Sequence, residues 1–210
     1  MAARHENITR LYLESISKGL NAIHVPSDPV IVGAVERAIQ LSSVKSFVLA
    51  TVEARNLREE LGLCRQIEAD AIILHGSCTD SAGKDVARIL ETIKERFKDV
   101  PTGVATHSPG TVIPQILQVK EVDLILAPLN LRGDFMDPDA HTTLRAIAES
   151  RRMGKKLLAM KSLAAGSLTP DEAFRYLVDK ADGVAVGITS VEELDSVLDA
   201  GLRYFSARGC

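Results

Sequence analysis

Short apolar runs recur along the chain at fairly even spacing. They are rich in Val, Ile, Leu and Ala, and none alternates cleanly between apolar and polar residues. This pattern is typical of strands that are buried on both faces, as in a parallel sheet. The seven predicted strands are Asn21–Val25, Ser46–Thr51, Ala71–His75, Thr102–Thr106, Asp123–Ala127, Lys156–Lys161 and Gly183–Ile188.

Between these strands, apolar residues at three- and four-residue spacing predict helices. Clear examples are Val86–Phe97 and Glu192–Phe205, and a further helix, Asn7–Lys18, is predicted before the first strand. Helix starts are marked by a capping side chain before a proline or by capping-box spacing. The first kind is Asp28-Pro29, Ser108-Pro109 and Thr169-Pro170, and the second is Thr169–Glu172 and Ser190–Glu193.

The repeated strand–loop–helix pattern predicts an α/β fold of the TIM-barrel type, lacking the first of eight strands. Eight-stranded barrels take roughly 250 residues, and the 210 residues here fall about one strand–helix unit short, before residue 1. No glycine-rich dinucleotide fingerprint follows a strand, which favours a barrel over an open Rossmann sheet. No linker or block of charge divides the chain, so residues 1–210 are predicted to form one barrel domain.

Composition excludes several classes of protein. Apolar residues make up 46% and charged residues 25% of the chain, which is typical of a globular protein. A net charge of −3 gives no basic footprint for nucleic acid or an anionic membrane. No apolar run approaches the roughly 18 residues of a membrane span. The odd cysteine count (Cys64, Cys78 and Cys210) fits a reducing cytoplasm, which is the predicted location.

In a barrel the chemistry lies at the carboxyl ends of the strands. The polar residues at those positions are His24, Thr51, Glu53, His75, Thr106, His107, Asn130, Lys161, Thr189 and Ser190. Histidines gathered on one rim supply a proton donor near neutral pH. A metal site with Glu53 is the alternative, but no local ligand motif is present and no metal is predicted. Each imidazole also fits a plain hydrogen bond to a neighbouring strand or loop.

The other strand ends also allow two interpretations. Lys161 is suited to binding an anion or forming a Schiff base, or it pairs with a carboxylate at the rim. The helix after Ser190 offers amides to a phosphate, yet Glu192 and Glu193 compete for the same positive end. Cys78, with no activating base in the sequence, is predicted to be an inert loop thiol.

Seven segments in order resemble strands of the aldo-keto reductases, in particular a bacterial branch with HG, SSH, YN and MKPLAGG strand ends. Gly19–His24 (GLNAIH) is similar to GINFID, and Ala71–Gly76 (AIILHG) to LLLLHG. The other similar segments are Ser46–Val52, Thr102–Pro109, Val122–Asn130, Lys156–Gly166 and Val184–Glu193. The resemblance implies hydride transfer from NADPH to a carbonyl, with a tyrosine acid assisted by lysine, aspartate and histidine.

Most of that catalytic set is absent. His24 stands at the aspartate position, Val52 at the lysine position, and no tyrosine occurs in Pro26–Val30; only His75 is retained. On the cofactor side, the resemblance implies binding roles for Asn130, Lys161 and Ser190. No arginine stands in Gly187–Leu194 for a 2′-phosphate, and Ser196-Val197 replaces the usual Glu-Asn pair.

Three hypotheses follow, with a metal-assisted lyase or hydrolase as a distant fourth. In the first, the barrel has lost conventional carbonyl reduction but binds NADP(H) or a small anion at the rim of His75, His107, Asn130 and Lys161, where His107 contacts the substrate or anion. In the second, it is an active oxidoreductase with His24 or His75 as the substitute acid. In the third, it is a non-catalytic barrel subunit, whose exposed sheet edge pairs in a homo-oligomer.

Overall fold

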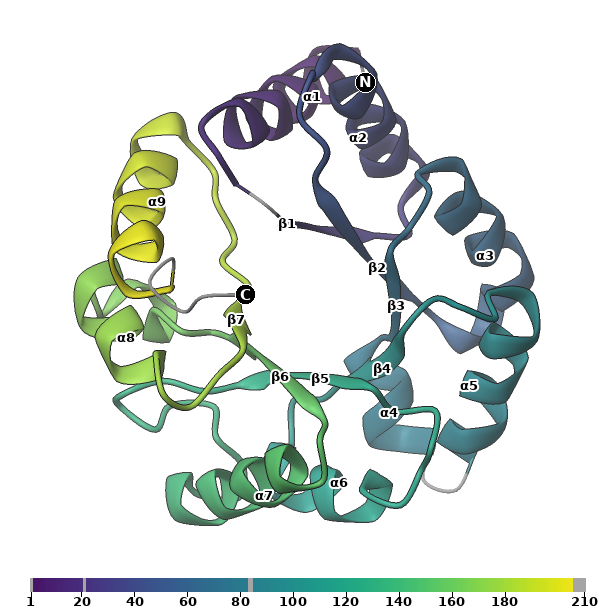
Figure 1. The fold of residues 1–210 in the computed structure, drawn as a ribbon, viewed down its shortest axis with the longest axis vertical. Coiled ribbons are helices and arrows are strands. Elements are labelled where there is room, and N and C mark those ends of the chain that lie inside the picture. The colour runs from purple at the N-terminus through teal and green to yellow at the C-terminus, as the bar shows by residue number, and fades with distance from the viewer. Residues whose placement is uncertain (1, 21, 83–84, 206–210) are drawn as a thin grey trace.

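A computed structural model describes residues 2–20, 22–82 and 85–205 and shows a parallel sheet curled into an open barrel (Figure 1). All seven predicted strands are present, each close to its predicted position. Asn21 and Cys210 lie outside the described residues. The strands are β1 (Ala22–Pro26), β2 (Phe47–Val52), β3 (Ala71–Leu74), β4 (Thr102–Ala105), β5 (Leu124–Pro128), β6 (Lys156–Met160) and β7 (Gly183–Val184).

Helices surround the strands on the outside (Figure 1). The predicted helices Val86–Phe97 and Glu192–Phe205 are present within one residue of their expected bounds, and the predicted Asn7–Lys18 begins five residues earlier, at Ala2. The helices are α1 (Ala2–Ser17), α2 (Pro29–Leu41), α3 (Leu57–Gln66), α4 (Gly76–Ala82), α5 (Asp85–Arg96), α6 (Pro109–Ile116), α7 (Ala140–Arg152), α8 (Pro170–Leu177) and α9 (Val191–Phe205). No helix in the described part of the chain is both long and apolar enough to cross a membrane.

The strands follow one another in sequence order across the sheet, from β1 to β7. This order is that of a barrel and not of a doubly wound sheet. Within the described residues β1 and β7 are the two edges. β7 is much shorter than the predicted Gly183–Ile188; in the described residues its pairing with β6 is limited to Leu158–Gly183 and Ala159–Val184.

Alternate residues of β2 to β6 face two different cores, which explains why these strands do not alternate in polarity. One core lies between the sheet and the helices and includes Ile72, Leu74 and Val104. The other lies inside the barrel. Its members are Leu49, Ala71, Ile73, Ala105, Leu124 and Leu126, with Leu158, Met160 and Ala185 packed against them.

Two of the predicted helix starts are confirmed as full caps. The Asp28 carboxylate accepts hydrogen bonds from the first amides of α2, and Thr169 forms a complete capping box with Glu172. α6 begins at Pro109 with Ser108 at the N-cap, as predicted, but the Ser108 side chain makes no capping bond; the Ser108 amide donates to Thr106 Oγ1. Ser190 Oγ accepts from the Glu193 amide, while the Glu193 carboxylate accepts mainly from Thr189.

An aspartate stands immediately before every second strand, a feature that the hydrophobic pattern did not single out. Asp70, Asp123 and Asp182 precede β3, β5 and β7. The carboxylate of each accepts a hydrogen bond, at 2.8–2.9 Å, from an amide near the start of the preceding strand. The amide of each also donates to the carbonyl of that same residue. We call these paired bonds the aspartate latches; they join β2 to β3, β4 to β5 and β6 to β7.

Candidate functional site

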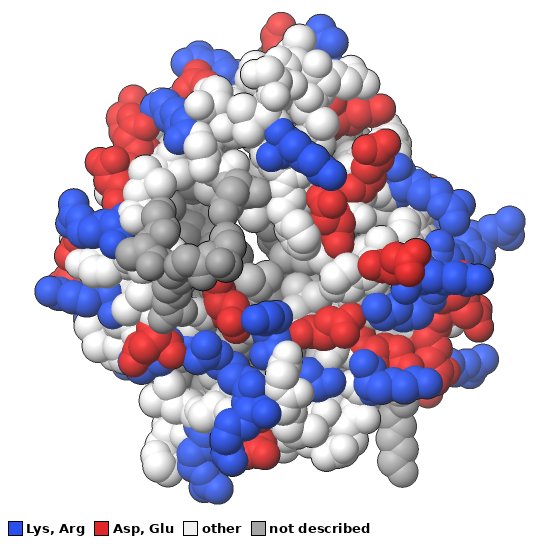
Figure 2. Space-filling model, in the orientation of Figure 1, with Lys and Arg blue, Asp and Glu red and all other residues white. Residues whose placement is uncertain are grey.

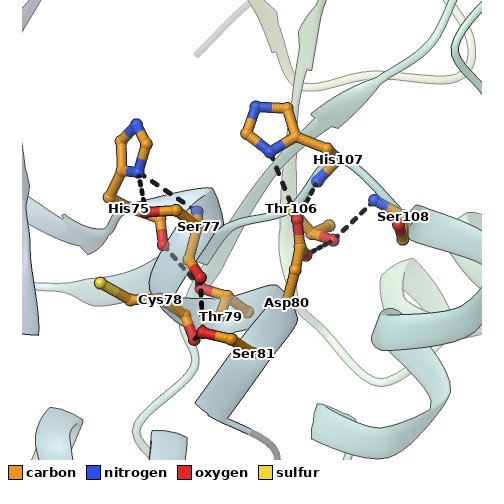
Figure 3. Close-up of polar contacts among 9 residues, drawn as sticks. All are labelled: His75, Ser77, Cys78, Thr79, Asp80, Ser81, Thr106, His107 and Ser108. Carbon is orange, nitrogen blue, oxygen red and sulfur yellow. Dashed lines mark hydrogen bonds and ion pairs between the residues drawn. The ribbon is translucent and has the colours of Figure 1, made fainter.

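His75 follows β3 directly and caps the short helix α4. Its Nδ1 accepts a hydrogen bond from the Ser77 amide at 3.2 Å and lies 2.8 Å from Ser77 Oγ (Figure 3). An amide N–H can only donate, so Nδ1 must present its lone pair. The proton of the neutral ring is therefore on Nε2, which leaves His75 as a hydrogen-bond donor toward the mouth of the barrel.

His107 follows β4 and has the opposite tautomer. Its Nδ1 lies 3.2 Å from the Asp80 carboxylate, which also accepts a bond from the His107 amide at 3.0 Å. An ionised carboxylate can only accept, so Nδ1 carries the proton and Nε2 of the neutral ring presents a lone pair. The second Asp80 oxygen accepts from Thr106 Oγ1. Asp80 thus holds the end of β4 from its place on α4.

The two imidazoles lie side by side. Their ring centroids are 6.2 Å apart and their planes are inclined at 63°. Figure 3 shows both Nε2 atoms on the same side, away from the bonds that hold each Nδ1. Gly76 makes this closeness possible, because a Cβ at that position would lie only 2.6 Å from Cε1 of His107.

His24 is the third histidine of the predicted rim. It lies on β1 with its Nε2 at 2.5 Å from Oγ1 of Thr51, on the neighbouring strand. Burial, with a smaller electrostatic contribution from His75, lowers the pKa of His24 below its ordinary value. The ring is therefore neutral at neutral pH, which argues against an imidazolium acid at this position.

The lowered pKa of His24 predicts how stability responds to acid. Below the ordinary pKa of about 6.5 the unfolded chain takes up a proton at His24 that the folded chain resists, so the free energy of unfolding falls as the pH falls. We expect His24→Gln to lose less stability than the wild type between pH 7.5 and pH 5.5. Urea unfolding of both proteins at the two pH values measures this. Parallel losses would show that His24 titrates alike in both states.

Asn130 occupies the place predicted for cofactor binding, but its amide is fully used within the protein. The side chain is 1% exposed. Its nitrogen donates to the carbonyls of Asp134 and Lys161, and its oxygen accepts from the amides of Arg132 and Asp134. Asn130 therefore ties the loop after β5 to the loop after β6, and a cofactor would have to displace one of these bonds.

Lys161 is exposed, and its ammonium lies 4.6 Å from the ring centroid of Phe135, in the loop after β5. This is a cation–π contact. Both residues have a left-handed backbone, with φ of 53° at Lys161 and 62° at Phe135. The contact with Phe135, and not the carboxylate pair considered from the sequence, is what holds the Lys161 side chain.

The loop after β6 stores strain next to Lys161. Ala165 has φ of 55°, a conformation that costs an L-residue roughly 1–2 kcal/mol. We expect Ala165→Gly to raise the free energy of unfolding by about 1 kcal/mol, because glycine adopts this conformation freely. Thermal and urea unfolding measure it.

The opposite substitution at the next position, Gly166→Ala, tests the same backbone strain. Gly166 has φ of 85°, and no atom lies within 4 Å of the position that an alanine methyl would take, so only backbone strain can act there. That variant should lose stability by a similar amount. Equal stability of both variants and the wild type would contradict the left-handed loop.

Ser190 lines a cleft of about 530 Å³ between α1 and the start of α9, away from the histidines. The cleft is lined by Asn7, Ile8, Arg10, Leu11, Ile188, Thr189, Ser190, Val191 and Glu192. Hydrogen bonds from their own segment lower the pKa of Glu192 and of Glu193, so both are ionised at neutral pH. Arg10, a cation lining this cleft, is paired with Glu14. The chain's own carboxylates thus occupy the positive end of α9, and in this arrangement the residues do not fit the phosphates of NADP(H).

The described residues offer no metal site. No group of three His, Cys, Asp or Glu side chains among them is placed to share an ion. Glu53, the carboxylate considered for such a site, pairs with Arg55 at 2.7 Å. Cys78 Sγ accepts a hydrogen bond from the Ala54 amide at 3.3 Å, which is a structural use of this thiol.

Asp80 is the site residue that strand-end reasoning missed. It lies five positions after His75, within the helix that His75 begins. A carboxylate one turn into a helix that starts at a strand end is a usable signal, because such a side chain reaches toward the end of the next strand. The sequence His75–Asp80 (HGSCTD) contains that signal.

Comparison with known proteins shows that the fold of this chain is a known one. No protein-family model matches the chain, and no curated protein sequence matches it. Solved structures do match over nearly the whole chain. Aldo-keto reductase AKR11C1 from Bacillus halodurans, in its holo form, has a TM-score of 0.68 at 15% identity, covering 91% of this chain and 80% of its own.

The thermostable aldo-keto reductase Tm1743, in complex with the inhibitor epalrestat, gives 0.70 at 13% identity, covering 99% of this chain and 88% of its own. The chain has the aldo-keto reductase fold. Glycerol dehydrogenase AKR11B4 from Gluconobacter oxydans also shares it, with a TM-score of 0.63 at 15% identity over 94% of this chain and 85% of its own. Because a fold hosts many activities, the function of this aldo-keto reductase-like barrel has to be argued from its own residues.

Proposed function

We propose that this barrel binds a small carbonyl compound at its carboxyl-terminal mouth and has lost conventional carbonyl reduction. The observation that carries the proposal is the tautomer of His75. Because Ser77 donates its amide proton to Nδ1, Nε2–H of His75 is a fixed donor at the mouth. A carbonyl oxygen is the natural acceptor for such a donor, and the exposed His107 beside it adds a second polar contact.

The positions of the tyrosine phenols support the loss of conventional reduction. The chain has three tyrosines, and all lie on helices: Tyr12 on α1, Tyr176 on α8 and Tyr204 on α9. The Tyr12 hydroxyl donates to the His24 carbonyl at 3.0 Å, and burial raises its pKa. None of them follows β1, where the resemblance expects the acid.

The charge on the molecule supports a small ligand more than a polyanion. Figure 2 shows Lys and Arg side chains beside Asp and Glu side chains around most of one face. Pairs such as Lys94–Asp123 and Arg203–Asp171 belong to this mixed surface charge. A protein that binds nucleic acid concentrates one sign instead.

Binding of hydroxyacetone, an uncharged hydroxyketone, tests the proposal. We expect saturation-transfer NMR to detect binding to the wild type and His75→Gln to weaken it by about tenfold, the effect of losing one good hydrogen bond. His141→Gln is the matched control, since His141 is exposed on α7. Absence of binding, or equal binding by the two variants, would contradict the proposal.

Titration with NADPH and NADH, followed by nucleotide fluorescence, tests the cofactor prediction. Glu192 and Glu193 are ionised in the first turn of α9, where the resemblance puts the cofactor phosphates, so we expect no binding of either nucleotide at millimolar concentration. Micromolar binding would revive the oxidoreductase with a histidine acid. NADPH oxidation assays of the wild type and His75→Gln would then test that oxidoreductase hypothesis.

A non-catalytic barrel subunit is the second candidate function, and the open sheet favours it. β1 and β7 are edges within the described residues, and exposed edges invite pairing with another chain. Light scattering after size-exclusion chromatography distinguishes the two candidates. A stable dimer that does not bind hydroxyacetone supports the subunit, whereas a monomer that binds it supports the ligand-binding barrel.

A further inference from the structure

We propose that His107 is a general base, and that the mouth of this barrel catalyses proton transfer at the carbon beside a carbonyl without any redox cofactor. The substrate class is a small α-hydroxy aldehyde or ketone. This inference rests on the proposed function, because it needs the carbonyl to be held by His75.

His107 has the tautomer that a general base needs. Asp80 accepts the Nδ1–H of His107, so Nε2 presents its lone pair to the mouth. A proton taken up at Nε2 makes the ring an imidazolium, and the adjacent carboxylate stabilises that positive charge. Asp80 is therefore a positioning residue, and its bond to the His107 amide also holds the ring where it is.

The site pairs a hydrogen-bond donor with an acceptor. His75 offers Nε2–H and His107 offers an Nε2 lone pair, from rings whose centroids are 6.2 Å apart. Both Nε2 atoms point to the same side in Figure 3, so one small molecule can face both. A neutral imidazole that polarises a carbonyl while a separate base removes the neighbouring proton is an established arrangement for enolisation.

The reaction balances without an external oxidant or reductant. His107 Nε2 takes the proton from the hydroxyl-bearing carbon, the C–H electrons form a C=C bond, and the carbonyl electron pair moves onto oxygen, where His75 Nε2–H holds it. The proton of the neighbouring hydroxyl then passes through His75 to that oxygen. Finally, the other oxygen re-forms a carbonyl, and the His107 imidazolium returns its proton to the former carbonyl carbon. The carbonyl and hydroxyl groups have exchanged places.

Deuterium exchange in the full chain measures the first half of this reaction. Hydroxyacetone is incubated with the protein in D₂O without nucleotide, and the proton signal of its hydroxyl-bearing carbon is followed by NMR. We expect its decay to be faster than in buffer. His107→Gln should slow it by at least about a hundredfold, the usual contribution of a general base, whereas His141→Gln should leave the rate unchanged.

Asp80→Asn separates positioning from plain structural support. The amide keeps an oxygen for the His107 N–H groups but removes the charge that stabilises the imidazolium. We expect the exchange rate to fall while hydroxyacetone binding and unfolding free energy stay near those of the wild type. In the wild type, imidazole ¹⁵N shifts should report a protonated Nδ1 at His107 and a protonated Nε2 at His75.

The outcomes distinguish this inference from the proposed function. Binding of hydroxyacetone by the wild type without catalysed exchange overturns the inference and leaves the proposed function standing. Absence of binding overturns both. Exchange that survives in His107→Gln, or ¹⁵N shifts that place the His107 proton on Nε2, overturns the role of His107 as base.

Discussion

Gly103→Ala is expected to destabilise the protein by at least about 4 kcal/mol, enough to prevent folding in many proteins of this size. Gly103 lies in β4 opposite Leu124 of β5. A Cβ at this position would lie 2.0 Å from the Leu124 carbonyl oxygen and 2.8 Å from its carbonyl carbon. β5 cannot retreat, because it is bonded to β6 on its other side.

The matched control is Gly62→Ala in α3. A Cβ there has nothing within 4 Å, so that variant should be as stable as the wild type or gain up to about 1 kcal/mol. Urea unfolding, or the yield of folded protein, compares the two. If Gly103→Ala lost less than about 1 kcal/mol, the close approach of β4 to β5 would be wrong.

Asp80→Ala is expected to have the second largest effect on stability, a loss of about 2–3 kcal/mol. It removes the acceptor of three groups: the Thr106 hydroxyl, and the His107 amide and Nδ1. Thr106 is 0% exposed, so water does not replace the carboxylate there. The loss should therefore exceed that of an ordinary surface substitution.

Urea unfolding of Asp80→Ala and Asp80→Asn measures this effect. Asp80→Asn retains an acceptor and a donor and should lose much less than the alanine variant. Asp199→Ala, at an exposed position of α9, should change stability by no more than about 0.5 kcal/mol. A loss in Asp80→Ala as small as that of Asp199→Ala would mean that the carboxylate does not hold the end of β4.

Much of the fold could be predicted because each strand is a short apolar run closed by a turn or cap. β1 to β6 follow from that pattern, and the sequential strand order follows from the alternation with helices. The end of β7 could not be predicted from the sequence. Ala185–Ile188 is as apolar as a strand, but within the described residues no strand lies beside it on the side away from β6. The Ser108-Pro109 pattern predicted where α6 begins, although the Ser108 side chain makes no capping bond there.

The site was predictable in position but not in detail. Strand-end reasoning placed His75 and His107 on one rim, and the structure brings their rings together. The tautomers depend on Ser77 and Asp80, whose contacts are set by where α4 begins and by the register of β3 with β4. The hydrogen bonds of Asn130 could not be predicted either. All four are made to the backbone of loops, whose conformation does not follow from the spacing of apolar residues.

The aspartate latches divide the sheet into three clasped pairs, β2–β3, β4–β5 and β6–β7, and leave β1 outside this scheme. The seam between the first two pairs lies between β3 and β4. At the opposite end of the barrel, Asp80 crosses that same seam from α4 to the end of β4. A ligand held between His75 and His107 would span it too. Occupancy of the mouth would therefore act as a second clasp and, by mass action, resist separation of the β2–β3 pair from the β4–β5 pair.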